Sequence, residues 1–294
     1  MGDRGSIPLE GGTPRHQPRG VLRRAATLLC PAPGWPAGHV RPWIPVFISF
    51  KLCALALAVE HYPVAALVVL FAPDPWLFVQ FILPSQQAFG PAIRSFETDR
   101  NEVWLTIDDG PDPASTPRVL ELLKAHGAKA TFFVVGSQVA KHPDLARMIV
   151  AEGHTIANHT LTHPLGTFWC ASPSRTAREI EGCIGALLIA DAPFERYFRP
   201  PVGVRNPFLE PQLAARGMRL VLWNARGFDG GSRSAVSALA AISGSVKPGA
   251  ILLSHEAGPG AAKRIRFLEL LLEHLAERRF TCVLPRPDRL RTAG

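Results

Sequence analysis

Residues 102–112 read EVWLTIDDGPD, a strand pattern that ends in two acidic residues and a turn. Residues 102–107 are mostly apolar or β-branched and predict a buried strand. The strand runs directly into Asp108 and Asp109, and Gly110 and Pro111 then make a turn. Two adjacent carboxylates at a strand end fit an ordinary polar turn. They also fit a metal ligand beside a catalytic base, because a divalent cation lets both acids stay ionised.

From about residue 100 onward, short β-rich runs alternate with helical patterns. Strands are predicted at 102–107, 131–136, 219–223, 250–253 and 280–284, and helices at 116–126, 144–152, 175–189, 206–216 and 261–278. This alternation predicts an α/β fold with a parallel sheet or barrel. In such folds functional residues follow the C-terminal ends of strands, which makes the two aspartates candidates.

A second polar group stands at residues 158–164, which read NHTLTHP. If this stretch is helical, His159 and His163 share one side of the helix, since they are four residues apart. Two such histidines alone fit a structural role as well as a ligand role. Beside a carboxylate pair they indicate a site of two histidines and one aspartate. Three protein ligands with an open position suit a catalytic metal.

Three more groups lie at predicted turns: RPPVG at 199–203, WNARGFD at 223–229 and LLSH at 252–255. Taken singly, they fit a surface arginine, a turn aspartate and a histidine at a strand end. Their order along one α/β chain favours a common site.

The five ordered motifs, beginning with IDDGPD at 107–112 and HTLTH at 159–163, resemble those of the NodB-type polysaccharide deacetylases, carbohydrate esterase family 4. The resemblance covers about residues 100–285. It implies a distorted (β/α) barrel and a metal-dependent hydrolase that removes N-acetyl or other N-acyl groups from a carbohydrate. A catalytically silent carbohydrate-binding relative is the alternative.

The resemblance also implies a metal centre made by Asp109, His159 and His163. Zinc is the expected divalent metal, given two histidines and one aspartate.

The remaining roles follow from the same resemblance. Asp108 is the expected general base, and Arg199 holds it in place. His255 is the expected general acid, and Asp229 orients it. The backbone N–H of Val202 helps to hold the oxyanion.

The chain departs from the family pattern at three positions that shape the substrate pocket. Arg226 stands where the family often has aspartate, Gly230 where it often has tryptophan, and Val202 where it often has an aromatic residue. The substrate is therefore open between a glycan polymer and a lipid-linked amino sugar carrying acetyl or formyl. Arg226 and Arg205 suit a phosphate-bearing substrate, and they also fit ordinary surface or ion-paired arginines.

The charge of the chain is unevenly distributed. The 294 residues carry a net charge of +8. Residues 1–42, predicted to be a disordered basic arm, hold six arginines against Asp3 and Glu10 and so contribute +4 of it. The remainder has no stacking or groove-reading motif, so no nucleic-acid partner is expected.

Residues 43–84 are predicted to be membrane-associated. Residues 43–59 are apolar except for Lys51, and residues 62–83 are apolar with breaks at Pro63 and residues 73–75. Three interpretations fit: a helical hairpin of imperfect spans, a single span, or an apolar layer packed on the catalytic domain. The expected location is a membrane of the bacterial inner-membrane type, with the arginine-rich arm in the cytoplasm. Two spans leave the catalytic domain, residues 100–285, in the cytoplasm, and one span puts it outside.

Overall fold

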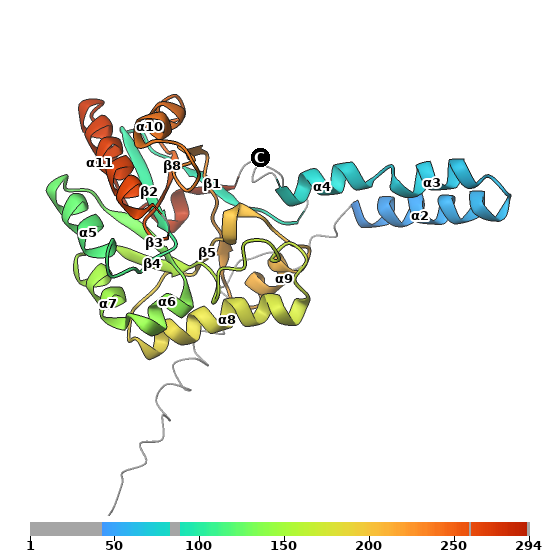
Figure 1. The fold of residues 1–294 in the computed structure, drawn as a ribbon, viewed down its shortest axis with the longest axis horizontal. Helices are drawn as coiled ribbons and strands as arrows, with labels where there is room; N and C mark the ends of the chain where they lie inside the picture. The colour runs from blue at the N-terminus through green and yellow to red at the C-terminus, as the bar shows by residue number, and fades with distance from the viewer. Residues whose placement is uncertain (1–42, 83–88, 259, 293–294) are drawn as a thin grey trace, which may run out of the picture.

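The computed structural model describes residues 43–82, 89–258 and 260–292, so the predicted basic arm lies outside the described residues. Three apolar helices come first, and an α/β domain follows (Figure 1). The apolar helices are α2 (Trp43–Val59), α3 (Pro63–Phe71) and α4 (Asp74–Ile82). The domain's helices are α5 (Thr116–Ala125), α6 (Gly136–Lys141), α7 (Pro143–Ala151), α8 (Pro173–Ile189), α9 (Leu209–Ala214), α10 (Ala235–Ser243) and α11 (Ala261–Glu277).

The domain is built on one curved sheet of eight parallel strands, with helices outside it (Figure 1). Its order is β6-β5-β4-β3-β2-β8-β7, and β9 pairs with β2 beside this path. The strands are β2 (Glu102–Asp108), β3 (Ala130–Val134), β4 (Thr155–Asn158), β5 (Tyr197–Phe198), β6 (Arg219–Leu220), β7 (Ala225–Arg226), β8 (Ile251–His255) and β9 (Thr281–Cys282). A separate antiparallel pair joins β1 (Ile93–Phe96) to β10 (Leu290–Thr292). The predicted α/β architecture is therefore found.

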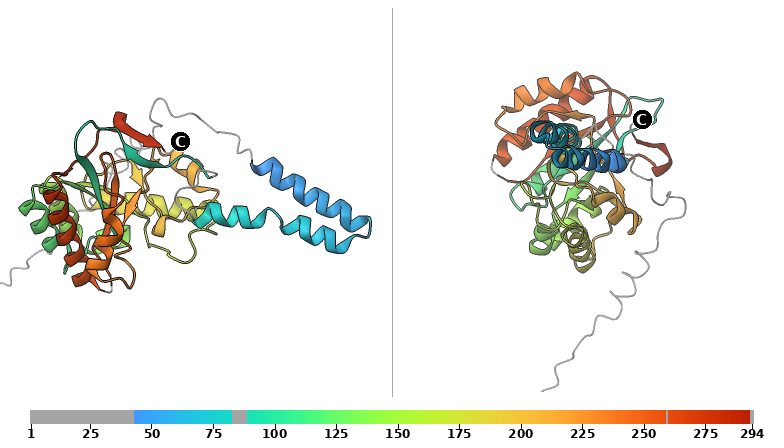
Figure 2. Two further views of the ribbon diagram at one scale, coloured as in Figure 1. Left: turned by 90° about the horizontal axis from the view of Figure 1, so that it is seen from above. Right: turned by 90° about the vertical axis from the view of Figure 1, so that its right-hand side faces the viewer.

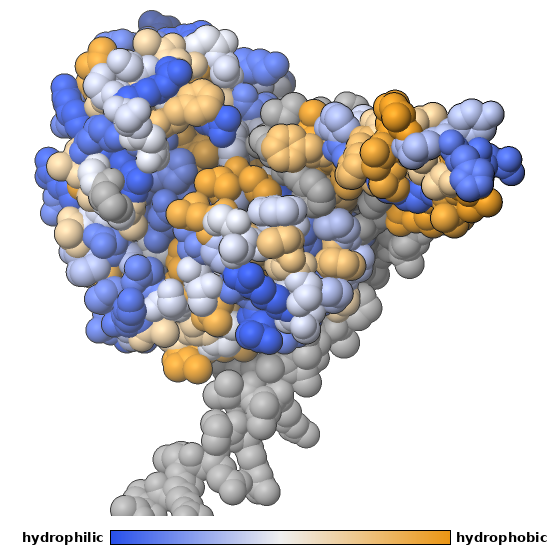
Figure 3. Space-filling model, turned by 45° about the vertical axis from the view of Figure 1, so that its right-hand side comes forward, coloured by the Kyte–Doolittle hydropathy of each residue, from blue (hydrophilic) through white to orange (hydrophobic). Residues whose placement is uncertain are grey.

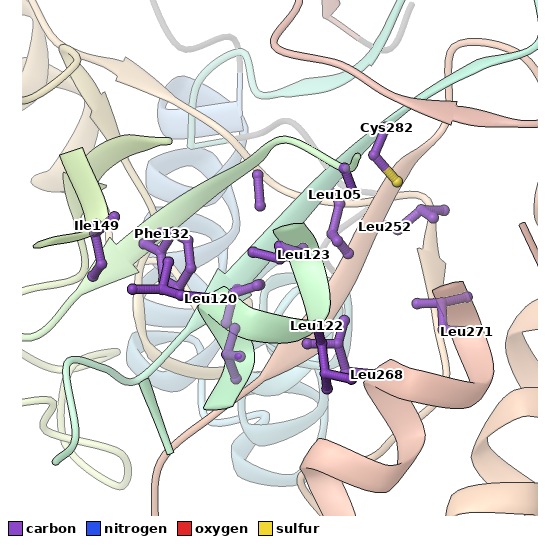
Figure 4. Close-up of a cluster of buried hydrophobic side chains, with 14 of the residues drawn as sticks. Leu105, Leu120, Leu122, Leu123, Phe132, Ile149, Leu252, Leu268, Leu271 and Cys282 are labelled. Atoms are coloured by element: carbon purple, nitrogen blue, oxygen red, sulfur yellow. The ribbon is translucent and has the colours of Figure 1, made fainter. Parts of the chain in front are cut away.

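Central strand β2 is buried on both faces, which explains its unbroken apolar run. Val103, Leu105 and Ile107 belong to an outer core that also contains leucines of α5 and α11, and Figure 4 shows Leu105 within it. Trp104 belongs to a second core on the other face of the sheet. Side chains alternate along a strand, so Asp108 faces the same inner side as Trp104. The strand thus delivers a carboxylate to the inside of the curved sheet.

The strands predicted at 131–136 and 250–253 match β3 and β8. The strand predicted at 219–223 is shorter in the structure, where β6 covers only its first two residues. The difference has a physical reason, because the carbonyl groups of Val221 and Leu222 accept hydrogen bonds from the Arg199 side chain. Strand β4 escapes prediction because four residues are too few for a clear alternating pattern.

The apolar helices form a hairpin that projects from the domain (Figures 1 and 2). Helix α3 runs back along α2, and α4 continues toward the domain. Lys51 joins the two arms, because its Nζ donates to the Leu70 carbonyl and to Asp74 Oδ1, the latter at 3.2 Å.

The large apolar side chains of the hairpin are mostly exposed, as the orange surface of the projecting part shows (Figure 3). Leu55 is 62% exposed and Val64 is 74% exposed. The interpretation of this segment as a layer packed on the domain is therefore wrong. Residues 63–80 are long and apolar enough to cross a membrane, and 44–59 form a shorter apolar helix.

Candidate metal centre and active site

The two aspartates leave the sheet in different directions. Asp108 is the last residue of β2 and is paired in register with His255 of β8. Asp109 follows in the left-handed region, with φ of 80°, a conformation that aspartate tolerates better than most residues. The turn that Gly110 and Pro111 predict is therefore present, and it separates the two carboxylates.

His159 and His163 lie in a loop after β4, so the expectation that they share one side of a helix is wrong. Thr160 and His163 adopt left-handed backbone angles, with φ of 71° and 54°. The Asn158 side chain accepts from the Thr160 N–H, and the Thr160 hydroxyl accepts from the His163 N–H. These bonds curl the loop so that both imidazole rings face Asp109.

Asp109 Oδ1 lies 3.2 Å from His163 Nε2 and 3.5 Å from His159 Nε2. His159 Nδ1 lies 2.7 Å from the Arg199 carbonyl oxygen. Because a carbonyl only accepts, Nδ1 carries the hydrogen and Nε2 keeps its lone pair. Asp109 Oδ1 is buried, and no described residue donates a hydrogen bond to it. Acceptors that face one another in this way fit a divalent cation between them.

Electrostatics at this cluster favour the forms that bind metal. Burial and the neighbouring His159 lower the pKa of His163 to about 4, which leaves its ring neutral. Burial alone would raise the pKa of Asp109. The close approach of His159 and the positive charge of His255 instead hold it well below its usual range.

Asp108 is held by a fully buried arginine. Arg199 Nη1 donates to Asp108 Oδ1 at 2.6 Å and to the Thr106 hydroxyl at 2.9 Å. Its guanidinium carbon lies 4.0 Å from the centre of the Phe133 ring. The Asp108 carboxylate is thereby fixed 3.8 Å from His159 Nε2, beside the three candidate ligands.

His255 is held by Asp229 through two bonds. Its Nδ1 lies 3.0 Å from Asp229 Oδ1, and its backbone N–H donates to Oδ2 at 2.8 Å. Burial lowers the pKa of His255, but the hydrogen bond and charge of Asp229, with the charges of Asp109 and Asp108, raise it to about 9. The imidazolium is thus stabilised at neutral pH.

The three positions that depart from the family pattern lie in different surroundings. Val202 is 53% exposed and has φ of 50° in the turn Pro201–Gly203. Arg226 lies with its guanidinium carbon 4.0 Å from the centre of the Phe228 ring. A Cβ on Gly230 would meet the His255 ring at 3.5 Å, so the glycine leaves that ring open.

The interpretation of Arg205 as an ordinary surface arginine is wrong, because its side chain is 1% exposed. Its Nη1 donates to the Gly90 carbonyl at 3.2 Å. Burial, followed by the charge of Arg94, lowers its pKa to about 10.

Sequence reasoning missed Glu179 of α8. Its carboxylate accepts from the N–H groups of Leu161 and Thr162 at 3.0 and 2.9 Å, and from the Thr162 hydroxyl at 2.7 Å. It therefore holds the loop between the two histidines. The available signal was a glutamate within the buried stripe of an amphipathic helix, beside Thr176 and Ile180.

Glu256, directly after His255, was also missed. It is fully buried under the aspartate turn, and Thr116 Oγ1 donates to its Oε2 at 2.9 Å. Burial raises its pKa to about 8. A Cβ on Gly110 would lie 1.5 Å from Glu256 Oε1, which explains the glycine in the turn.

Comparison with known proteins gives the same family as the motifs. The polysaccharide deacetylase family model matches residues 96–221. A chitooligosaccharide deacetylase of Bradyrhizobium sp. is 36% identical over 163 residues, which are 55% of this chain and 74% of that protein. A peptidoglycan-N-acetylglucosamine deacetylase of Bacillus cereus is 30% identical over 199 residues, which are 64% of this chain and 89% of that protein.

Solved structures agree with the fold. A family 4 carbohydrate esterase of Streptomyces lividans in complex with acetate has a TM-score of 0.58 at 28% identity, covering 69% of this chain and 98% of that chain. A family 4 pseudoenzyme of Bacillus anthracis has a TM-score of 0.59 at 26% identity, and the match covers 66% of this chain and 67% of that chain. The chain therefore belongs to the polysaccharide deacetylase family, among the enzymes of carbohydrate esterase family 4.

Proposed function

We propose that this protein is a metal-dependent carbohydrate N-deacetylase held at a membrane by its apolar hairpin. One observation carries the proposal. Asp109, His159 and His163 face one point, with the Asp108–Arg199 pair on one side and the His255–Asp229 pair adjoining it. This arrangement supports the assignment of a base, an acid and a cation site at the C-terminal ends of strands of one sheet.

Asp109, His159 and His163 would hold the cation, with zinc the best match to this donor set. A bound divalent cation supplies Lewis acidity toward the acyl carbonyl and toward water.

The chain's own residues would then move the protons. Asp108, oriented by Arg199, takes a proton from the attacking water. The Val202 N–H donates to the developing oxyanion. His255 Nε2 protonates the leaving nitrogen, because an amide anion is too basic to depart alone, while Asp229 holds Nδ1. Water and the N-acetyl sugar thus become acetate and a free amino sugar.

Acetate release from N-acetylglucosamine oligomers tests the reaction. We expect release by the purified full chain, its loss on chelation, and its recovery with added zinc. Activity that survives chelation, or that survives Asp109→Ala, would contradict the proposal. Sugar binding without release from any substrate would instead identify a silent relative, like the Bacillus anthracis pseudoenzyme.

The hairpin favours one side of the membrane. Helix α2 begins and helix α4 ends at the side of the hairpin that faces the domain (Figures 1 and 2). The arginine-rich arm is expected in the cytoplasm, so a hairpin returns the chain to the cytoplasmic face. This favours a lipid-linked amino sugar over an external polymer. A reporter fused after Gly294 tests it, and an external reporter would refute the cytoplasmic assignment.

We further propose the division suggested by the sequence, with residues 1–42 as a basic arm, 43–84 as the membrane segment and 100–285 as the catalytic unit. The antiparallel pair of β1 and β10 lies outside that range and packs into the core of the same domain, which extends the catalytic unit at both ends.

A further inference from the structure

Four cationic side chains gather around the loop that carries Asp229. The guanidinium carbons of Arg226 and Arg233 lie 4.0 and 5.0 Å from the centre of the Phe228 ring. From α11, Lys263 Nζ donates to the Gly231 carbonyl, and Arg264 Nη2 lies 3.4 Å from the Gly230 carbonyl oxygen. These four side chains, Arg226, Arg233, Lys263 and Arg264, are called the cationic rim below.

Nothing in the described part of the chain neutralises this rim. Within residues 43–82, 89–258 and 260–292, none of its four members forms an ion pair with a carboxylate. Both oxygens of the nearby Asp229 are already bonded to His255. Neither Asp229 oxygen is therefore left to pair with the rim.

Arg264 is a buried member of the rim with hydrogen-bond donors that the described residues leave unpaired. It is only 7% exposed, yet among the described residues its Nε and Nη1 have no hydrogen-bond partner. Leaving a buried charged group without partners is costly. The planar guanidinium is suited to paired hydrogen bonds with phosphate or carboxylate oxygens. An anionic group at this place would satisfy donors that the protein leaves open.

The start of α11 adds a second attraction for an anion. Gly258 and Gly260 precede the helix with left-handed φ of 93° and 85°. Gly260 caps the helix without a side-chain bond, and the first turn holds no acid. The N-terminal end of a 17-residue helix favours negative charge. A Cβ on Gly258 would lie 3.1 Å from Arg264 Nη1, so the glycine lets the backbone pass close to the guanidinium.

The cationic rim adjoins the proposed reaction centre. A Cβ on Gly230 would lie 3.5 Å from His255 Nδ1, and the Gly230 carbonyl faces Arg264. Gly230 is exposed and Arg226 is half-buried, so this edge of the site is accessible. An anion bound here would belong to the molecule whose leaving nitrogen His255 protonates.

We propose that the cationic rim and the first turn of α11 bind a phosphate group carried by the amino-sugar substrate. The inference rests on the proposed deacetylase function and names its substrate class, a phosphorylated N-acyl amino sugar. Such a phosphate comes from a lipid carrier or from a soluble sugar phosphate, and a neutral glycan polymer lacks it.

Kinetics on two matched substrates test the proposal. The full chain in neutral detergent is given N-acetylglucosamine 1-phosphate and the neutral methyl glycoside of N-acetylglucosamine. We expect kcat/KM to favour the phosphorylated sugar by roughly tenfold or more. Lys263→Gln and Arg226→Gln should each reduce this preference by roughly fivefold to tenfold, through KM. Arg118→Gln, an exposed arginine of α5, is the matched control and should keep the preference. A preference that is absent in the wild type, or unchanged in both rim variants, overturns the proposal.

Binding separates this site from catalysis. Calorimetry on Asp109→Ala should still detect N-acetylglucosamine 1-phosphate, and adding Lys263→Gln should weaken that binding. If acetate is never released but this binding pattern holds, the proposed function fails and the phosphate site stands. If binding is indifferent to Lys263→Gln, the phosphate site fails whatever the activity. A prenyl-phosphate-linked sugar that binds more tightly than the soluble one supports a lipid carrier, and equal binding supports a soluble sugar phosphate.

Discussion

At the scale of single residues, Arg199 shows how a buried charge is held in this fold. The side chain has no exposed surface, and its donors reach Asp108, Thr106 and the backbone of residues 221 and 222. Removing one partner of such a pair leaves the other charge buried and unpaired.

We therefore expect Arg199→Met to lower the free energy of unfolding by about 3–5 kcal/mol, because Asp108 loses its cation. Denaturant unfolding followed by tryptophan fluorescence measures the change. Arg118→Ala breaks the exposed pair with Glu121 and should change stability far less. Equal effects of the two substitutions would show that the buried pair is not special.

The pKa of His255 gives a second prediction at this scale. Its folded value, about 9, lies above the ordinary value because Asp229 and the neighbouring carboxylates outweigh burial. As a general acid His255 must be protonated, so kcat/KM should fall as the pH rises through its pKa. Asp229→Asn removes the main raising influence, so the alkaline limb should move to lower pH. A pH profile of the variant checks this, with the exposed Asp288→Asn as control. An alkaline limb that stays in place would exclude His255 as the group that sets it.

At the scale of elements, the metal site depends on a contact between helix α8 and the loop after β4. Glu179 receives three hydrogen bonds from the segment between the two histidines. Residues 160 and 163 adopt unfavourable left-handed angles, so the loop needs such support to keep its shape.

Loss of this support should weaken metal binding. We expect Glu179→Ala to reduce zinc affinity by about 10–100-fold, because the ligands are no longer pre-positioned. Competition with a coloured chelator measures affinity without any need for activity. Glu181→Gln is the matched control, since Glu181 lies on the same helix and pairs with Arg216 at the surface. Unchanged affinity in Glu179→Ala would show that the loop keeps its shape alone.

Short elements are also where prediction from sequence was weakest. The long amphipathic pattern of α11 was visible, because five leucine and isoleucine side chains repeat at helical spacing. Strands β5, β6 and β7 have two residues each and were missed or misjudged, because pairing with neighbours defines them and their own pattern does not.

At the scale of the whole molecule, the hairpin carries much of the exposed apolar surface, whereas the visible face of the domain is mixed (Figure 3). The hairpin buries little of its own apolar surface, with 17% of the candidate span buried. Large exposed apolar surfaces usually mark a contact with another protein or with a membrane. The length and composition of the hairpin helices fit a lipid bilayer.

Charges placed in the hairpin should release the protein from membranes. We expect Leu55→Glu with Val64→Glu to move the full chain from the membrane fraction toward the soluble fraction, since each charge near a bilayer centre costs about 2.5–3.5 kcal/mol. Ile189→Glu, at an 82% exposed position of α8, should leave fractionation unchanged. Retention of the double variant on membranes would show that another surface anchors the protein.

The sequence was enough to predict the family, the α/β class and the set of polar residues at strand ends. Motifs and the alternation of strand and helix patterns are local features of the sequence, and they can be recognised without the structure. The sequence did not determine how those residues meet. The loop that carries both histidines is bent by Glu179, which lies about 17 residues away. Arg199 reaches Thr106 across 93 positions, and Arg264 meets the Asp229 loop across 34. The packing of α3 back along α2, which makes these helices a hairpin, is likewise seen only in the tertiary structure. Such contacts arise from the folded path of the backbone, and no periodicity along the chain reports them.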